Sequence, residues 1–345
     1  MTLRGIFSRW RNAAPRAPLV AGAILLWLVG VALISLPGSI AWHDAQSLDE
    51  AVRHPPTWKV VPLVDWNQPA ESSSAQGDSA IAIPPTAARP LPGPLLAWGR
   101  WTYSILGHDD LGRSLYYRLV GGFLISLAIG LAAAGVAVAV GTTWGAVAAL
   151  SGDWVDRLLM RVVDVLYGLP YTLMVILLKV GLTRPLTSLF GGDTRAADVV
   201  ILFVAIGGVS WLTTARVVRG QILSLRTRAF VEAARAMGAG RFRVLIRHIV
   251  PNVVGPVLTY AALVVPQAIM QEAFLSYLGI GIQQPIPSLG RLCADGVDAV
   301  NSMVGYWWLL LFPCLTTFLT LLSLNVLADG VRDALDPGSR VANEP

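Results

Sequence analysis

Residues 231–251 read Val-Glu-Ala-Ala-Arg-Ala-Met-Gly-Ala-Gly-Arg-Phe-Arg-Val-Leu-Ile-Arg-His-Ile-Val-Pro, an arginine-rich stretch between two long apolar segments. Four apolar residues at its start recur at helical spacing and predict one stripe on a short helix, namely Phe230, Ala233, Ala234 and Met237. Gly238 is expected to end this helix, because glycine readily adopts the left-handed conformation that closes helices. The helical period then restarts and predicts a second helix that runs until Pro251. The stretch is therefore predicted to form a short, exposed helix followed by a sharp bend.

The composition of the chain indicates an integral membrane protein. Of its 345 residues, 54% are hydrophobic and 14% are charged, which is unlike an ordinary soluble domain. A helix crosses the core of a bilayer with about 20 apolar residues. Apolar runs of sufficient length lie near residues 18–36, 121–149, 160–182, 197–215, 251–275 and 304–327. We therefore expect an all-α integral membrane protein with about six transmembrane helices.

The placement of arginine predicts how the chain is oriented. Short cytoplasmic loops carry an excess of Lys and Arg, and Arg4, Arg9, Arg11 and Arg16 precede the first apolar run. The loop at 216–248 carries eight arginines against one acidic residue. Both termini and this loop are therefore predicted to be cytoplasmic. Nucleic-acid binding is not expected, because the basic residues lie at membrane boundaries without a stacking surface.

The arginine-rich stretch also resembles a known signature. The Glu-Ala-Ala of residues 232–234, the later glycine and the closing Val250-Pro251 resemble the EAA signature of the membrane subunits of binding-protein-dependent ABC importers, in which Leu-Pro is the usual ending. In that family the signature forms a coupling helix in a groove of the ATP-hydrolysing subunit. The resemblance implies a coupling helix at about 226–240. The residues that it assigns to ATPase coupling are Glu232, Ala233, Ala234, Arg235 and Gly238.

Further segments resemble the same family in the same order. Residues 106–115, Leu-Gly-His-Asp-Asp-Leu-Gly-Arg-Ser-Leu, resemble a segment of the C-type membrane subunit of dipeptide, oligopeptide and nickel importers. Residues 272–288 are similar to the external loop after the fifth span of that subunit, and residues 328–337 are similar to its closing signature. The resemblance implies the type I ABC importer permease fold over roughly residues 100–338.

The function implied by this resemblance is transport of di- or oligopeptides across the bacterial inner membrane, with nickel or another small solute as the alternative. The implied partners are two ABC ATPase subunits, a second, homologous permease, an external solute-binding protein and membrane lipid. The sequence has no Gly-x-x-x-x-Gly-Lys-Ser/Thr loop for nucleotide phosphates. ATP and Mg are therefore expected on the partner subunits, no cofactor is expected on this chain, and the chain is not expected to be an enzyme.

Catalytic and metal-binding residues are not predicted. The sequence contains no His-Glu-x-x-His motif, and its two cysteines, Cys293 in an expected outer loop and Cys314 in the sixth span, do not form a metal or disulfide pattern. A secondary transporter driven by an ion gradient is an alternative, but it needs a midplane ion site and usually inverted repeats, and no convincing repeat is found. A structural membrane scaffold is the other alternative.

Polar residues within the apolar runs are candidates for a translocation path. Gln267 and Gln271 lie four residues apart on one predicted helix face, and Glu272 follows them. Packing against a partner permease explains these three residues equally well, so both interpretations stay open. Asp164 is expected to pair with Arg161 on its own helix.

One glycine pattern predicts a contact between helices, and the apolar runs together with the resemblance predict how the chain is divided. The glycines of Gly141-Thr-Thr-Trp-Gly145 have the spacing of a helix-packing contact. The chain is divided into a cytoplasmic amino terminus with the first helix, retained as an anchor (1–36), an external segment that is partly disordered (37–117), the permease domain (118–330) and a cytoplasmic tail (331–345).

Overall fold

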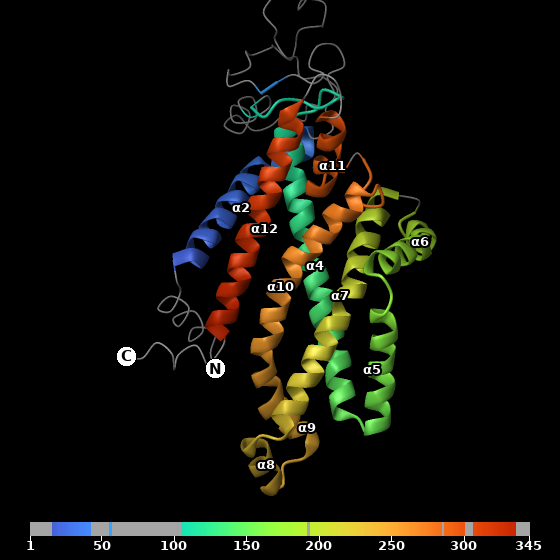
Figure 1. Cartoon of the computed structure of the whole chain (residues 1–345), viewed down its shortest axis with the longest axis vertical. Coiled ribbons are helices and arrows are strands. Elements are labelled where there is room, and N and C mark those ends of the chain that lie inside the picture. The colour runs from blue at the N-terminus through green and yellow to red at the C-terminus, as the bar shows by residue number, and fades with distance from the viewer. Residues whose placement is uncertain are drawn as a thin grey trace, which may run out of the picture. The chain divides into compact units, whose positions relative to one another are not determined.

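The computed structural model of the protein describes residues 16–42, 55–56, 102, 105–191, 194–284, 286–300 and 306–335. Its helices in chain order are α2 (Arg16–Trp42), α4 (Leu115–Leu150), α5 (Asp153–Tyr167), α6 (Tyr171–Leu189), α7 (Thr194–Arg226), α8 (Ala229–Ala236), α9 (Arg241–Val244), the π-helical η3 (Leu245–Ile249), α10 (Val250–Tyr277), α11 (Leu289–Val300) and α12 (Trp307–Leu335). The expected all-α class is confirmed (Figure 1).

Among the described residues, six helices are long and apolar enough to cross a membrane. They are Pro18–Leu36, Leu115–Leu150, Tyr171–Leu189, Val199–Arg226, Leu245–Tyr277 and Trp307–Leu335. The expected number of spans is therefore confirmed. Most of the predicted external segment 37–117, and the tail beyond α12, lie outside the described residues.

The third span lies later in the chain than the predicted range 160–182. Gly168 follows α5 and donates its backbone N–H to the carbonyl oxygen of Asp164 at 3.1 Å, which closes that helix. Pro170 precedes α6 and has no N–H with which to continue a helix. The interruption divides the predicted span into the amphipathic α5, which carries several charges, and the apolar α6.

The helix after the sharp bend was predicted to end at Pro251, and this prediction is wrong. Helix α9, the π-helical turn η3 and α10 follow one another without a gap. Pro251 directly follows the π-helical turn, in which the N–H of Val250 donates to the carbonyl oxygen of Leu245, so proline falls where the regular i→i−4 bonds are already interrupted. The arginine-rich segment therefore leads directly into the fifth membrane span.

The described residues belong to two compact units, one within residues 1–25, 127–272 and 321–345 and the other within residues 26–126 and 273–320. In the first unit, α4 and α7 lie side by side (Figure 1) and approach closely at two glycines. A Cβ atom at Gly141 would lie 2.6 Å from Cβ of Thr214, and one at Gly145 would overlap the carbonyl oxygen of Ala215. The glycine spacing is thus confirmed as a helix-packing contact.

In the second unit, a buried ion network joins the loop before α4 to α11. The carboxylate of Asp109 accepts hydrogen bonds from Arg113 Nε at 2.7 Å and from Arg118 Nη1 at 2.6 Å. Arg118 also contacts Asp295 of α11, with 3.4 Å between Nη2 and Oδ2. Because the backbone N–H groups of Leu111 and Arg113 donate to Asp109 as well, this one carboxylate organises the whole loop.

Helix α11 was not predicted from the sequence. Four of its five buried residues recur at helical spacing, a periodic signal that was present in the sequence, namely Leu289, Leu292, Gly296 and Ala299. Cys293, which was expected in a loop, lies within this helix, and its Sγ is 3.8 Å from Sγ of Cys314 in α12. Both cysteines are free thiols.

The crossing of α4 and α7 predicts the effect of enlarging a glycine. We expect Gly145→Val to destabilise the protein by about 1–3 kcal/mol, because the new side chain must displace the backbone of α7. Thermal unfolding of the purified protein in detergent measures this change. Gly135→Val places the same side chain in α4 where no atom lies within 4 Å. Equal melting temperatures for the two variants would contradict the close crossing.

Candidate functional site

Helix α8 ends in the turn that the sequence predicted. Gly238 has φ +85, a left-handed conformation that L side chains rarely adopt. Its N–H donates to the carbonyl oxygen of Arg235 at 2.9 Å, and the N–H of Ala239 donates to that of Ala234 at 3.0 Å. These two bonds form a Schellman motif, which satisfies carbonyl groups that the end of a helix leaves without partners. The predicted role of Gly238 in ending the helix is therefore confirmed.

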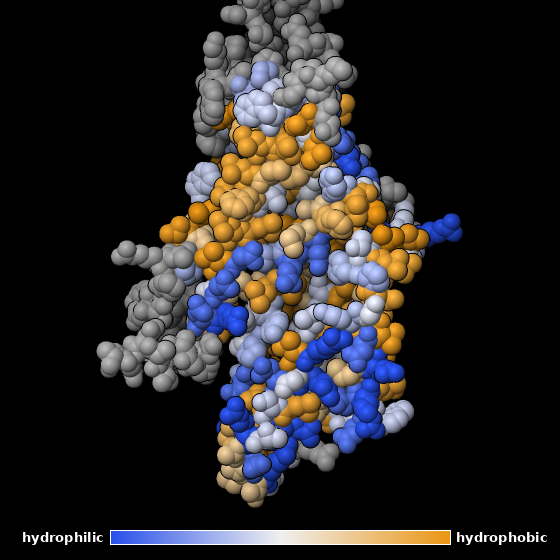
Figure 2. All heavy atoms as spheres, viewed as in Figure 1, coloured by the Kyte–Doolittle hydropathy of each residue, from blue (hydrophilic) through white to orange (hydrophobic). Residues whose placement is uncertain are grey.

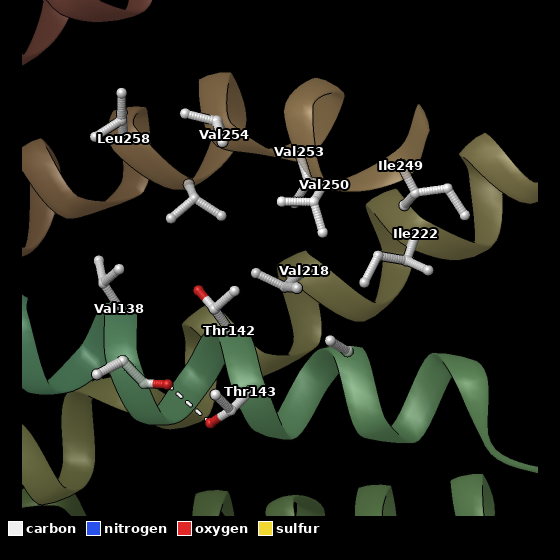
Figure 3. Close-up of a pocket in the computed structure, with 13 residues that line it drawn as sticks. Val138, Thr142, Thr143, Val218, Ile222, Ile249, Val250, Val253, Val254 and Leu258 are labelled. Atoms are coloured by element: carbon white, nitrogen blue, oxygen red, sulfur yellow. Dashed lines mark hydrogen bonds between the residues drawn. The ribbon is translucent and has the colours of Figure 1, made fainter. Parts of the chain in front are cut away.

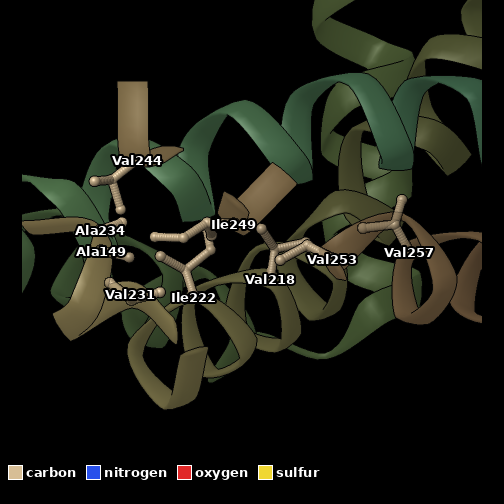
Figure 4. Packing of buried hydrophobic residues seen from close by; sticks show 9 residues of the cluster. All are labelled: Ala149, Val218, Ile222, Val231, Ala234, Val244, Ile249, Val253 and Val257. Atoms are coloured by element: carbon tan, nitrogen blue, oxygen red, sulfur yellow. The ribbon is translucent and has the colours of Figure 1, made fainter. Parts of the chain in front are cut away.

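One face of α8 is buried against the rest of the first unit. Val231 is fully buried and Ala234 is 3% exposed, and both belong to an apolar cluster formed with α4, α7, α9, η3 and α10 (Figure 4). The other members of the cluster are Ala149, Val218, Ile222, Val244, Ile249, Val253 and Val257. Because Ala234 packs within the chain, it anchors α8 from beneath.

The opposite face of α8 is open. Glu232, Ala233, Arg235 and Gly238 are all exposed. Phe230 is 43% exposed and Met237 is 83% exposed, so the stripe predicted from the sequence faces outward, with the exception of Ala234. Hydrophilic side chains gather over this end of the first unit (Figure 2). The exposed face thus combines charge, a small alanine and two large apolar side chains.

Two ion pairs, one in the first turn of α5 and one in its last turn, hold α5 to the second half of α7. Both nitrogens of the Arg219 guanidinium that face α5 contact the carboxylate of Asp156 at 2.5 Å. Asp164 was expected to pair with Arg161, and this expectation is wrong, because its Oδ1 lies 2.9 Å from Arg216 Nη2 of α7. The guanidinium of Arg216 also lies 4.1 Å from the ring centre of Tyr167, a cation–π distance.

An apolar pocket of about 430 Å³ lies between α4, α7 and α10 (Figure 3). Five residues of its wall also belong to the cluster beneath α8, namely Val218, Ile222, Ile249, Val253 and Val257. Thr142 and Thr143 are the polar side chains among its lining residues, and Thr143 Oγ1 donates to the carbonyl oxygen of Ala139 in its own helix at 2.8 Å. This lining offers little to a polar solute.

A second pocket of about 440 Å³ has a polar lining. It lies in the first unit, between the α5–α6 junction, α7 and α10, and Gln267 and Gln271 both line it. Glu272 is fully buried but is not among the lining residues, so the structure brings together two of the three residues predicted for a translocation path.

Most of the hydrogen-bonding groups of this pocket were not predicted from the sequence. These are the hydroxyl groups of Tyr167, Tyr171, Ser210, Thr213, Thr214 and Tyr260. The break between α5 and α6 gives Tyr171 its place at the pocket, and Gly168 and Pro170 were a signal for that break. The hydroxyl residues of α7 carry no local signal that separates them from ordinary residues of an apolar helix.

A family profile matches the part of the chain that carries both sites. Six apolar helices, with an exposed, capped helix between the fourth and the fifth, define a multi-pass membrane protein. The profile described as "binding-protein-dependent transport system inner membrane component" matches residues 141–341. The chain belongs to this family and is therefore the membrane component of an ABC transporter.

Curated relatives resemble the chain over about two thirds of its length. The oligopeptide transport system permease protein OppC of Haemophilus influenzae is 42% identical, over 69% of this chain and 71% of the relative. OppC of Escherichia coli is 46% identical, over 68% of this chain and 72% of the relative. The dipeptide transport system permease protein DppC of Bacillus subtilis is 40% identical, over 68% of each.

A solved structure supports the fold. One chain of the MetNI methionine ABC transporter, in inward facing conformations, gives a TM-score of 0.51 at 16% identity, over 64% of this chain and 97% of that chain. At this identity the likeness bears on the fold alone. The fold is the type I ABC permease fold that the sequence resemblance implied.

Ala234 is buried and its neighbour Ala233 is exposed, so the same substitution by aspartate should affect the two positions differently. We expect Ala234→Asp to release α8, because a carboxylate in the apolar cluster loses its hydration without gaining a partner. Limited digestion with trypsin of the purified protein should then cut this segment at least about tenfold faster, since 1.4 kcal/mol of local stability changes the open population tenfold. Ala233→Asp, on the exposed face, should leave the digestion rate unchanged; similar acceleration in both variants would contradict the assigned burial.

Proposed function

We propose that this chain is the permease subunit of an ATP-driven importer of di- or oligopeptides in the bacterial inner membrane. The observation that carries the proposal is the exposed, capped helix α8 in a chain whose curated relatives, at 40–46% identity, are oligopeptide and dipeptide permeases. The chain itself is a transport subunit, and hydrolysis of ATP takes place on its partners.

The exposed face of α8 is the surface that binds an ABC ATPase subunit. Glu232, Ala233, Arg235 and Gly238 form its contacts, and the small side chain of Ala233 allows the backbone of α8 to approach the wall of a groove closely. Phe230 and Met237 flank it with apolar area that is removed from water on docking. Ala234 contributes from beneath by fixing the rotation of the helix.

The remaining partners follow from the family. Two ATPase subunits carry ATP and Mg, a second, homologous permease completes the membrane core, and an external solute-binding protein delivers the substrate. The arginine excess of residues 216–248 supports a cytoplasmic position for α8 and for both termini. These arginines also support contact with anionic membrane lipid.

The polar pocket forms part of the translocation path. Gln267 and Gln271 line it, and Glu272 follows them on α10. Helices α7 and α10 line this pocket and also supply the cluster that anchors α8. A displacement of α8 by the ATPase is therefore passed to the pocket through these helices, and the two states of the pocket must differ in their affinity for substrate for the coupling to work.

The exposed carboxylate of α8 predicts a selective loss of coupling. We expect Glu232→Lys to lower ATP-driven peptide uptake at least about tenfold, because loss of a charged contact at an interface costs about 1.5–3 kcal/mol. Uptake into proteoliposomes that hold the complete transporter measures this change. The same substitution costs α8 only about 0.3–1 kcal/mol through the helix dipole, so the chain should stay folded. Gly238→Pro should also abolish uptake, because proline cannot adopt the positive φ of this turn.

Asp298→Lys is the matched control, since it reverses an exposed acidic residue on α11. It should leave uptake unchanged. Normal uptake by the Glu232→Lys transporter would contradict the docking role of α8. Uptake by this chain without ATPase subunits would identify a secondary transporter, and uptake of nickel with no peptide would identify the alternative substrate.

A further inference from the structure

The polar pocket of the first unit contains only uncharged side chains among its described lining residues. Its hydrogen-bonding groups are hydroxyls from α5, α6, α7 and α10 and the amides of Gln267 and Gln271. Leu263, Val264 and Met174 supply part of the apolar wall between them. A charged group that entered would meet no opposite charge among these lining residues, which is unfavourable once its hydration is lost. The pocket is therefore suited to a polar but uncharged part of a substrate.

Two buried polar atoms on residues that line this pocket have no hydrogen-bond partner among the described residues. They are the hydroxyl oxygen of Tyr171 and Oε1 of Gln271. Each such atom costs about 1–3 kcal/mol when it is buried without a partner, so nearly all buried polar groups in proteins are paired. A ligand that supplies a partner to both atoms recovers this free energy when it binds.

The two atoms have complementary requirements. The hydroxyl of Tyr171 can donate a hydrogen bond, while Oε1 of Gln271 can only accept one. A peptide group offers one C=O acceptor and one N–H donor, and it carries no charge. Tyr171 and Gln271 approach the pocket from α6 and α10, two separate helices. Its volume of about 440 Å³ lies in the range of small-ligand sites and suits a short segment of an extended chain.

We propose that this pocket binds the backbone of the transported peptide, with Tyr171 Oη donating to a peptide carbonyl and Gln271 Oε1 accepting from a peptide N–H. The inference rests on the proposed function and adds what part of the substrate the permease recognises. Recognition of backbone groups accepts peptides of different sequence. Charged side chains of the substrate stay outside the pocket, where water can solvate them.

The experiment uses the complete transporter in proteoliposomes, with this chain, its partner permease, both ATPases and the binding protein. The substrates are radiolabelled tripeptides with neutral, acidic or basic side chains, and a neutral tripeptide with N-methylated backbone amides. We expect Tyr171→Phe and Gln271→Leu each to lower the rate of uptake at limiting peptide about 5- to 10-fold, the effect of losing one net hydrogen bond. The loss should be equal for the three side-chain classes.

The N-methylated peptide distinguishes a direct hydrogen bond from Gln271 to the substrate from a purely structural role of Gln271. Wild-type transporter should import it more slowly, and Gln271→Leu should cause little further loss with this substrate, because the same hydrogen bond is already absent. Both variants should melt at or above the wild-type temperature, since each removes a buried polar atom that lacks a partner. Tyr277→Phe, at an exposed tyrosine near the end of α10, is the matched control and should not change uptake.

The outcomes separate this inference from the proposed function. Peptide uptake by wild-type transporter with normal rates in both variants would overturn the inference and leave the proposed function standing. A loss confined to one side-chain class, or additive losses from Gln271→Leu and N-methylation, would overturn it as well. Absence of any peptide uptake by the wild-type transporter would overturn both.

Discussion

The burial of Val231 and Ala234 beneath α8 is the contact on which the candidate docking surface depends. A helix of eight residues is too short to be stable in water by its own hydrogen bonds. Its stability must therefore come from the apolar cluster that it shares with α4, α7, α9, η3 and α10. The same burial fixes the rotation of α8, and rotation decides that Glu232 and Ala233 face outward. Docking surface and core are thus two sides of one packing arrangement.

Features set by a single residue, such as a helix end, could be predicted from the sequence. Features set by tertiary packing, such as the buried face of a helix or the partner in an ion pair, could not. Gly238 was correctly assigned to a helix end, because the conformational freedom of glycine is a property of the residue itself. Which side of α8 is buried was only partly predicted from the sequence. Helical spacing fits the outward-facing Phe230 and Met237, and it fits the buried Val231 and Ala234 equally well. Asp164 was paired with its neighbour Arg161, but its partner Arg216 lies 52 residues away and reaches it only after folding.

The break between α5 and α6 was not predicted, because residues 160–182 were treated as one apolar run. Gly168 and Pro170 within that run indicated the break. The two glutamines of α10 were found because amides are unusual in an apolar run, but the hydroxyl groups opposite them were not.

Helix α10 links the anchor of α8 to those amides. From Val253 to Gln267 it extends about 20 Å at 1.5 Å per residue. Pro256 and Pro266 lie on this stretch and remove backbone hydrogen bonds, so α10 is able to bend there.

The ion pairs of the chain differ in how far water reaches them. The side chains of Arg118 and Asp109 are 2% and 8% exposed, whereas those of Arg216 and Asp164 are 37% and 58% exposed. Dissolved salt screens exposed charges over about 8–10 Å and acts far less on buried ones. As ionic strength rises, the tie between α5 and α7 at Asp164 therefore weakens while the Asp109 network persists. The strength of the buried ion network is thus nearly independent of salt concentration, whereas that of the exposed ion pair depends on it.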